Sequence, residues 1–258
     1  MTLGRMSLAD RVAVVIGGTS GIGRTLSLGL AEAGAHVVAT SRRQAQVDAT
    51  AAELERLGTK TLRVACDVLD RSSLERLRGE VLSAFGRVDI LINCNGKTKR
   101  VPTLELTDAD WNDIIETNLT GSFRACQTFG APMLERGYGR IINIASLSSF
   151  AALFQTTAYS ASKAAVVSLT QSLAVEWGAS GVCVNAIAPG VFRTALNQEL
   201  LDGTERGREF LMRTPMRRFG KLEELVGAAV FLSSEAASFV NGEVLAVDGG
   251  FLASAVNQ

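Results

Sequence analysis

Short apolar runs alternate along the chain with longer segments in which apolar residues recur at helical spacing. Seven runs have the length and β-branched content of buried strands. Strands that alternate with helices predict right-handed crossovers and a parallel sheet covered on both faces. The expected strands are Val12–Ile16, His36–Thr40, Thr61–Ala65, Val88–Ile92, Arg140–Ala145, Val182–Ile187 and Glu243–Val247. The expected helices are Ile22–Ala33, Gln44–Leu57, Ser72–Phe85, Asp110–Glu135 and Ala158–Trp177.

This rhythm predicts an α/β protein with one doubly wound (Rossmann) domain spanning residues 1–258, because no Pro-rich, Ser-rich or charged linker divides the chain. One stretch, Phe192–Lys221, breaks the alternation with scattered glycines, charges and aromatics. Long excursions between strands are usually functional. We therefore expect a lid over the active site at about residues 191–220, with a decorative surface insertion as the alternative.

Composition narrows the class of protein. The 258 residues include 26 Lys+Arg and 26 Asp+Glu, so the formal charge is zero and no basic field predicts binding to nucleic acid or to an anionic membrane. No apolar run is long enough to cross a bilayer, and Met1–Asp10 does not resemble a signal peptide. We expect a cytoplasmic protein.

Cysteine and histidine are sparse. The four cysteines lie far apart, and His36 is the single histidine, so no metal site is expected. Buried free thiols in a reducing compartment are the simplest interpretation. A functional thiol is the alternative, with Cys94 as its best candidate.

Candidate chemistry lies in a tyrosine and a lysine four residues apart. Tyr159 and Lys163 would share one face of a helix, thirteen residues after Ser146. A nearby ammonium favours the phenolate, so the spacing predicts a lowered pKa for Tyr159 and a usable acid or base near neutrality. Ser146 would hold a substrate oxygen by hydrogen bonding. An ordinary helix with a half-exposed Tyr and a solvated Lys is the alternative for the bare spacing.

A glycine-rich turn follows the first expected strand. Gly17, Gly21 and Gly23 occur in the sequence Gly-Gly-Thr-Ser-Gly-Ile-Gly, directly before a helical pattern. Glycines at this point let the backbone approach a pyrophosphate at the positive end of the helix. The strand–turn–helix context predicts dinucleotide binding.

Together these motifs resemble the short-chain dehydrogenase/reductase family over about residues 8–251. The matching features, in the family's order, are the glycine turn, Asp67, Asn93 and Gly96, Asn118, the Ser146/Tyr159/Lys163 set, Pro189-Gly190 and Asp248-Gly249-Gly250. The chain departs from the family in having Ile16 where Thr is usual and Cys94-Asn95 where Asn-Ala is usual. These departures affect the local hydrogen bonding beneath the cofactor.

The resemblance implies hydride transfer between a nicotinamide cofactor and a carbon bearing a hydroxyl or carbonyl. Tyr159 would exchange the proton, Ser146 would orient the oxygen, and Lys163 would both acidify Tyr159 and bind the nicotinamide ribose. Asn118 would hold, through its backbone, a water that connects Lys163 to solvent. The implied cofactor-binding residues are Gly17, Thr19, Ser20, Gly21, Ile22, Gly23, Ser41, Arg42, Arg43, Asp67, Val68, Asn93, Gly96, Tyr159, Lys163, Pro189, Gly190 and Thr194.

The end of the second expected strand predicts which cofactor is used. Ser41 stands where NAD-dependent relatives carry an Asp, and Arg42 follows it. A guanidinium suits bidentate binding of a 2′-phosphate. The sequence therefore favours NADP(H) over NAD(H), with solvated loop arginines as the alternative.

The substrate is less determined. Candidate substrate residues are Lys97, Lys99, Arg100, Ser148, Phe154 and Phe192. A basic cluster at 97–100 suits a carboxylate-bearing substrate, although it is equally a solvated loop. The chain is similar to branches that act on keto-sugar acids, such as gluconate 5-dehydrogenases, and is compatible with 3-oxoacyl-carrier-protein reductases. A dinucleotide-binding sensor without turnover is a remote third possibility.

The expected helices at 110–135 and 158–177 carry more apolar residues than one sheet face requires. The surplus includes Phe123, Phe129, Val166, Leu169 and Leu173. Paired helices at a two-fold interface would cover them, and resemblance to the family implies a homotetramer or homodimer. Residues 251–258 would join a second interface.

Overall fold

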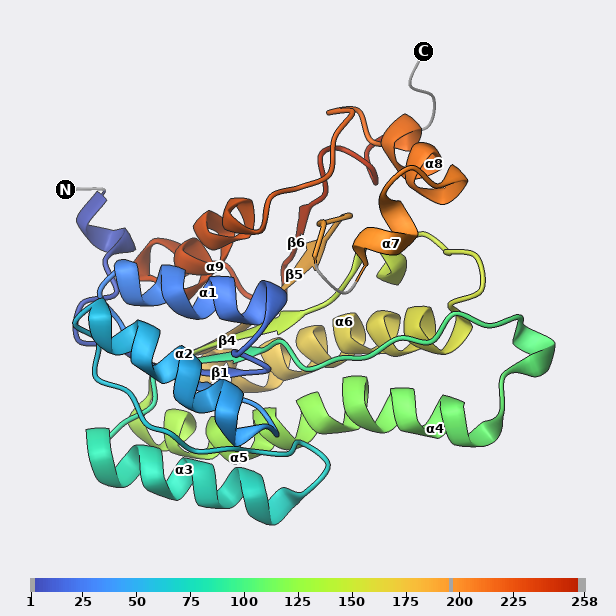
Figure 1. The fold of residues 1–258 in the computed structure, drawn as a ribbon. Coiled ribbons are helices and arrows are strands. Elements are labelled where there is room, and N and C mark those ends of the chain that lie inside the picture. The colour runs from blue at the N-terminus through green and yellow to red at the C-terminus, as the bar shows by residue number, and fades with distance from the viewer. Residues whose placement is uncertain (1–2, 195–196, 255–258) are drawn as a thin grey trace.

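A six-stranded parallel sheet lies at the centre of the protein (Figure 1). The computed structural model describes residues 3–194 and 197–254. The strand order is β2-β1-β3-β4-β5-β6, so it reverses between β1 and β3, where open α/β sheets bind ligands. The strands are β1 (Val12–Ile16), β2 (His36–Thr40), β3 (Ile90–Asn93), β4 (Gly139–Ile144), β5 (Val182–Pro189) and β6 (Val244–Val247).

Both faces of the sheet are buried under helices. Val12, Val14 and Ile16 of β1 join the core on one face, and Ala13 and Val15 join the core on the other. This alternation explains why the central strands are apolar at every position. One face is covered by α1 (Gly21–Glu32), α2 (Gln44–Arg56) and α9 (Val226–Ser233), and the other by α3 (Arg71–Phe85), α5 (Gly121–Arg136) and α6 (Thr157–Trp177).

The expected strand at Thr61–Ala65 is wrong, and the sheet therefore has six strands among the described residues rather than seven. The segment lies beside β2, and Cys66 N–H donates to the Ser41 carbonyl at 3.0 Å. At the next contact, the Thr40 hydroxyl donates to the Val64 carbonyl at 2.6 Å. The segment thus makes a single described backbone hydrogen bond beside β2, which is too few for a ladder.

The single helix expected at Asp110–Glu135 is divided. α4 (Asp108–Ile115) begins where the Thr107 hydroxyl accepts from the Asp110 N–H, and a wider π turn, Glu116–Thr120, joins α4 to α5. π turns inside helices occur frequently at functional sites. This turn carries Asn118, whose side chain is fully buried.

The predicted lid contains two helices, α7 (Gln198–Leu201) and α8 (Glu205–Arg213). The Thr204 hydroxyl accepts from the Gly207 N–H and caps α8. Residues 195–196 of the predicted lid, and 255–258 of the expected second interface, lie outside the described residues. The role of the segment as a lid stays a prediction.

The apolar surface expected on the long helices is mostly core. Phe123 alone of the five predicted residues remains more than a third exposed. The buried members are Phe129, Val166 and Leu173, with Leu169 packed against the core. On α4, α5 and α6, the exposed large apolar side chains are Trp111, Phe123 and Val175. The helical period correctly predicted that the five residues lie on helices, but it did not predict that four of them face the core.

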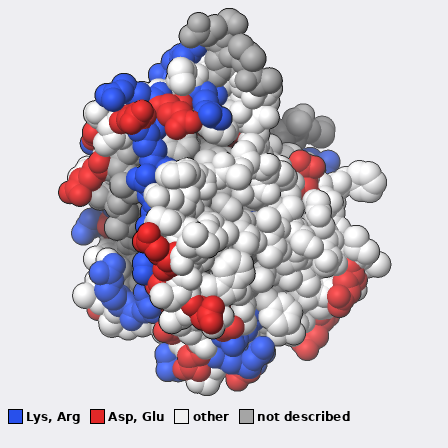
Figure 2. Space-filling view, turned by 90° about the vertical axis from the view of Figure 1, so that its right-hand side faces the viewer, with Lys and Arg blue, Asp and Glu red and all other residues white. Residues whose placement is uncertain are grey.

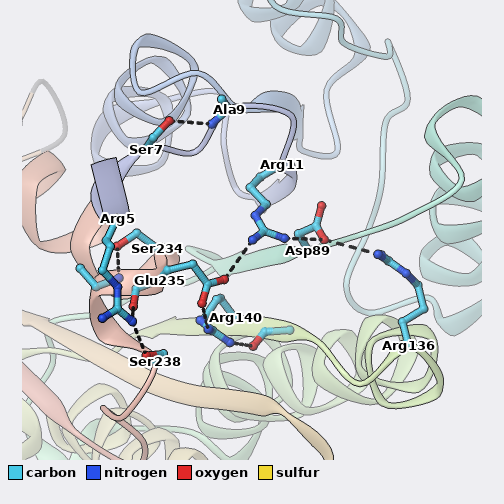
Figure 3. A network of polar contacts seen from close by, with 12 residues as sticks. Arg5, Ser7, Ala9, Arg11, Asp89, Arg136, Arg140, Ser234, Glu235 and Ser238 are labelled. Carbon is cyan, nitrogen blue, oxygen red and sulfur yellow. Dashed lines mark hydrogen bonds and ion pairs between the residues drawn. The ribbon is translucent and has the colours of Figure 1, made fainter. Parts of the chain in front are cut away.

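An ionic network lies at the amino ends of the strands (Figure 3). Asp89, which is fully buried before β3, forms ion pairs with Arg11 at 3.8 Å and Arg136 at 3.6 Å. Glu235 pairs with Arg11 at 2.9 Å and Arg140 at 3.4 Å. The network therefore connects β1, β3, β4 and the segment after α9.

Among the described helices, none combines the length and the apolar character that crossing a membrane requires.

Candidate active site

The turn between β1 and α1 is a backbone cradle. A Cβ on Gly17 would lie 2.8 Å from the Cys94 carbonyl oxygen, and a Cβ on Gly23 would lie 2.0 Å from the Gly17 carbonyl oxygen. Gly17 and Gly21 also have positive φ angles of 72° and 47°. Only glycine satisfies these contacts, and the result is a turn whose backbone is open to a ligand.

The start of α1 has free hydrogen-bond donors. Ser20 is the N-cap residue, but its side chain makes no capping hydrogen bond. Apart from its chain neighbours and the backbone of its own helix, no described atom lies within 4 Å of a Cβ built on Gly21. Unsatisfied amides at the positive end of a helix bind phosphate groups. The predicted residues from Gly17 to Gly23 therefore fit the pyrophosphate of a dinucleotide.

The residues expected to select the cofactor lie at the end of β2. Thr19 is buried, and its hydroxyl donates to the Ser41 hydroxyl at 2.7 Å. Arg43 donates to the Gln46 side chain at 3.0 Å, whereas Arg42 is exposed and has no polar partner among the described residues. A hydroxyl beside an uncommitted guanidinium suits a phosphate group better than a pair of ribose hydroxyls.

Two predicted cofactor residues follow Cys66. The Asp67 carboxylate accepts from the Leu69 N–H at 3.0 Å, which holds the turn before α3. Val68 is buried against Gly121, where an added Cβ would lie 2.7 Å from its side chain.

The side-chain amide nitrogen of Asn93 already donates to other residues of the protein. Its amide nitrogen donates to the Asn143 oxygen at 2.8 Å and so joins the ends of β3 and β4. Its own amide oxygen is buried without a partner among the described residues. Only that oxygen and the backbone remain for a ligand.

Asn118 joins the loop after β3 to α6. Its side chain accepts from the Lys97 N–H at 2.8 Å, donates to the Lys97 carbonyl at 3.0 Å and donates to the Ser162 hydroxyl at 2.9 Å. A Cβ on Gly96 would lie 3.5 Å from both the Asn118 oxygen and the Lys163 nitrogen. Asn118 therefore lies beside the predicted catalytic lysine.

Asn95 is a supporting residue that the sequence reasoning did not assign. Its side chain donates to the Thr117 carbonyl at 2.7 Å and to the Ser122 hydroxyl at 3.2 Å. Ser122 in turn donates to the Asn118 carbonyl at 2.8 Å. The departure from the family's usual alanine was the available signal, since a buried amide needs hydrogen-bond partners.

Ser146, Tyr159 and Lys163 come together at the carboxyl end of β4. The Ser146 hydroxyl accepts from the Ser148 N–H at 3.1 Å and lies close enough to the Tyr159 phenol to oppose the rise of its pKa. The Lys163 nitrogen lies 6.0 Å from the centre of the Tyr159 ring and donates to the Ile144 carbonyl at 2.6 Å. The i, i+4 spacing on α6 thus places Tyr159 and Lys163 together, and the end of β4 brings Ser146 to them.

The expected acidification of Tyr159 is absent from this structure. Burial raises the pKa of the Tyr159 phenol, and the hydrogen bond from Ser146 only partly opposes that rise. Burial also lowers the pKa of Lys163 to about 8. Desolvation dominates both groups because Lys163 directs its ammonium at the Ile144 carbonyl rather than at the phenol oxygen.

Cys94 lies in the same region. Burial raises the pKa of its thiol to about 11, despite the opposing effect of Lys163. A thiol that stays protonated at neutral pH is a weak nucleophile. The geometry therefore favours a packing role for Cys94 over a functional thiol. Among the described residues, no three His, Cys, Asp or Glu side chains gather as metal ligands.

The basic cluster expected at the mouth is largely neutralised. Lys97 forms an ion pair with Asp113, and Lys99 pairs with Asp110 at 2.7 Å. Arg100 is exposed, and no described carboxylate lies within ion-pair distance of it. Of the three predicted cations, Arg100 alone is uncommitted within the described part of the chain.

The other predicted substrate residues differ in exposure. The Ser148 hydroxyl is buried and lacks a partner among the described atoms, whereas Phe154 is 71% exposed. Phe192 is buried, and its ring fills the space where a Cβ on Gly220 would lie, 2.4 Å from the nearest ring atom. Phe192 therefore packs beneath the lid segment, and its assignment to the substrate site is not supported.

The last predicted cofactor residues follow β5. Gly190 lies against Asp248, where a Cβ would be 2.6 Å from the Asp248 Cα. The Thr194 N–H donates to the Asn197 side chain at 2.7 Å. A cavity of about 320 Å³ is lined by residues 191–192, by several residues of 214–224 and by residues 246–250, and no member of the catalytic set lines it.

Comparison with known proteins agrees with this geometry. The family profile described as "Enoyl-(Acyl carrier protein) reductase" matches residues 17–252. The chain is 41% identical over 248 residues to a gluconate 5-dehydrogenase of Gluconobacter oxydans (strain 621H), covering 96% of this chain and 97% of that protein. It is also 41% identical over 244 residues to a D-threitol dehydrogenase of Mycolicibacterium smegmatis (strain ATCC 700084 / mc(2)155), covering 95% and 94%.

A solved structure has the same fold. A gluconate 5-dehydrogenase from Burkholderia cenocepacia J2315, crystallised with NADP and tartrate, superposes with a TM-score of 0.95 at 36% identity, covering 99% of this chain and 100% of that one. The similarity extends over the glycine turn, the Ser146/Tyr159/Lys163 site and the lid segment. The chain belongs to the short-chain dehydrogenase/reductase family.

Proposed function

We propose that the protein is an oxidoreductase that interconverts a secondary alcohol and a ketone with NADP(H). The observation that carries this proposal is the meeting of Ser146, Tyr159 and the buried Lys163 at the carboxyl end of β4, next to the glycine cradle that ends β1. When bound, the nicotinamide supplies or accepts the hydride. The protein supplies the proton and the positioning.

Tyr159 is the proposed proton donor in ketone reduction and the acceptor in alcohol oxidation. Its raised pKa keeps the phenol protonated at neutral pH, which suits the donor role. Ser146 holds the substrate oxygen and polarises it. Lys163 is mostly protonated below its pKa of about 8, so its charge is present at neutral pH and stabilises the phenolate that proton donation leaves.

Asn118 is proposed to position Lys163 rather than to react. Its side chain binds the backbone of Lys97 and the Ser162 hydroxyl, and so fixes the loop after β3 against α6. A Cβ built on Gly96 would lie 3.5 Å from both the Asn118 oxygen and the Lys163 nitrogen. Its backbone carbonyl lies in the π turn, where Ser122 donates to it. A water held there would carry the proton from Lys163 to solvent.

NADP(H) is the proposed cofactor because Ser41 replaces a carboxylate and Arg42 is uncommitted among the described residues. A carboxylate would repel the 2′-phosphate, whereas a guanidinium binds it. The bound NADP of the Burkholderia cenocepacia enzyme supports this choice.

The proposed substrate is a sugar acid or a polyol. Arg100 is an uncommitted cation at the mouth, which suits a carboxylate, and the relatives with matching length act on gluconate and on D-threitol by their names. A 3-oxoacyl-carrier-protein reductase would need a basic docking surface for an acidic carrier. The pairing of Lys97 with Asp113 and of Lys99 with Asp110 weakens that alternative.

A substrate panel tests the proposal. We expect the purified protein with NADPH to reduce 5-keto-D-gluconate with a kcat/KM well above that for an acetoacetyl thioester. The opposite order would assign the protein to carrier-linked reduction. Cofactor binding without turnover of any carbonyl compound would instead indicate a dinucleotide sensor.

We also propose that the protein is a homodimer or homotetramer in the cytoplasm. The exposed Trp111, Phe123 and Val175 on α4, α5 and α6 are costly in water, and two-fold pairing of these helices would cover them. The free thiols agree with a reducing compartment. Light scattering at micromolar concentration measures the number of subunits.

A further inference from the structure

Arg100 and Arg206 come from different segments of the chain and lie near enough for the charge of one to act on the other. Arg100 follows β3 in the chain, and Arg206 lies on α8 of the lid segment. Neither has a carboxylate within ion-pair distance among the described residues, in contrast to the neighbouring Lys97 and Lys99. The charge of Arg100, together with burial as the larger cause, lowers the pKa of Arg206.

Both arginines are held at one short segment, Phe154–Gln155. The Val101 N–H, next to Arg100, donates to the Gln155 carbonyl at 3.0 Å. The Arg206 guanidinium donates to the Phe154 carbonyl at 3.4 Å. Two successive carbonyls therefore hold the backbone next to Arg100 and the guanidinium of Arg206 at the segment that leads into α6 and Tyr159.

The backbone of this segment is specialised. Gln155 has a φ of 62°, one of only three positive values among non-glycine residues in the described chain. Such a conformation costs free energy and persists where surrounding contacts maintain it. Here the positive φ of Gln155 lies in the turn from which the Phe154 carbonyl accepts from Arg206 and the Gln155 carbonyl accepts from Val101.

Arg206 is also held in place from the lid side. Its guanidinium lies 5.2 Å from the centre of the Phe210 ring, one helical turn away, and Phe210 lies 6.2 Å from the Phe251 ring. A guanidinium that packs over an aromatic ring still has its N–H groups, which lie in the plane of the guanidinium, available for a ligand. Figure 2 looks onto the right-hand side of Figure 1, where Lys and Arg side chains, with Asp and Glu side chains among them, surround a broad uncharged area.

Two like charges near each other repel, and an anion between them removes the repulsion. We propose that Arg206 and Arg100 together form a carboxylate-binding pair, and that Arg206 is a specificity residue through which the lid segment selects an anionic substrate. This inference rests on the proposed function. A carboxylate bound by both residues would join α8 to the loop after β3 and place the rest of the substrate toward Tyr159.

The test compares R206Q with R208Q in the full-length enzyme. Arg208 is on the same helix, is exposed and donates only to the Gly203 carbonyl, so R208Q removes the same charge from a different face. With saturating NADPH, we expect R206Q to raise the KM for 5-keto-D-gluconate about tenfold or more, as loss of a charge-assisted hydrogen bond does. R208Q should stay close to the wild type, and a neutral six-carbon ketose should react equally with both variants. Equal KM values for the keto acid in R206Q and R208Q would overturn the proposal.

A second measurement separates this inference from the proposed function. Tartrate, a dicarboxylate without a ketone, is used as an inhibitor of whichever carbonyl substrate the wild-type enzyme reduces. Weaker inhibition of R206Q than of R208Q upholds the anion site even if 5-keto-D-gluconate is not a substrate. Equal inhibition of the two variants overturns the anion site even if the enzyme does reduce keto acids.

Discussion

The ammonium of Lys163 lies 2.6 Å from the carbonyl oxygen of Ile144 and donates a hydrogen bond to it. Ile144 is the last residue of β4, and Ser146 follows two positions later. The strand that delivers Ser146 to the site therefore also anchors Lys163. The position of the lysine relative to the phenol depends on this contact as much as on the helical spacing.

Replacing Tyr159 by phenylalanine should remove the proton donor alone. We expect turnover to fall by at least on the order of 10²–10⁴-fold, the typical contribution of a general acid or base. Binding of NADPH, followed by fluorescence titration, should stay near the wild-type value because the ring remains. Y138F is a suitable control, since Tyr138 stacks with Arg11 and Arg140 at the opposite end of the strands. Substantial turnover by Y159F would refute the assigned role.

The lowered pKa of Lys163 should make the free energy of unfolding depend on pH. Its pKa is lowered from 10.5 to about 8 in the folded protein, so between these values the unfolded chain binds more protons than the folded chain. The free energy of unfolding should therefore rise with pH in this window and should not change with this group below it.

The measurement is urea unfolding of the cofactor-free wild type and K163M at several pH values. Between about pH 7 and about pH 9.5, the wild type should gain about 2 kcal/mol relative to K163M. A constant difference between the two proteins across that window would show that Lys163 titrates near its ordinary value.

Cofactor choice should respond to Ser41. S41D introduces a carboxylate beside the Thr19 hydroxyl, where we expect the 2′-phosphate to bind. The ratio of kcat/KM for NADPH to that for NADH should fall by about tenfold or more, because juxtaposed like charges cost several kcal/mol. R42Q should reduce the same ratio, whereas R43Q should change it less, because Arg43 is engaged with Gln46. A wild-type enzyme that prefers NADH would contradict the assignment from the start.

Asp89 should be critical for stability and not for chemistry. It is fully buried at the amino end of the sheet, against Arg11, Arg87 and Arg136. D89N leaves these guanidiniums without their shared carboxylate, so we expect a loss of about 3–5 kcal/mol in unfolding free energy. E235Q should cost less because Glu235 is partly exposed. Calorimetric melting of the two variants compares them, and a D89N variant as stable as E235Q would contradict the buried-charge argument.

Local patterns predicted much of the fold. Every strand of the sheet coincides with a predicted apolar run, because strands buried on both faces are apolar at consecutive positions. The same patterns predicted a strand at Thr61–Ala65, where the Thr40 side chain takes a carbonyl that a ladder would need. They also missed the π turn at Asn118, since a change of helical pitch leaves the apolar period nearly intact. Four of the five residues assigned to an interface lie in or against the core instead, and Phe123 alone stays exposed, because period alone does not say which neighbour a helix faces.

The sequence by itself determined the parallel α/β architecture, the glycine cradle and the spacing of Tyr159 and Lys163, because each depends on residues close together in the chain. Only the tertiary structure decided which groups the charged side chains contact. It pairs Lys97 with Asp113 and Lys99 with Asp110, turns Lys163 toward Ile144, and brings Arg206 near Arg100. These outcomes depend on distance and burial across distant segments, and electrostatic energies follow separation in space rather than separation along the chain.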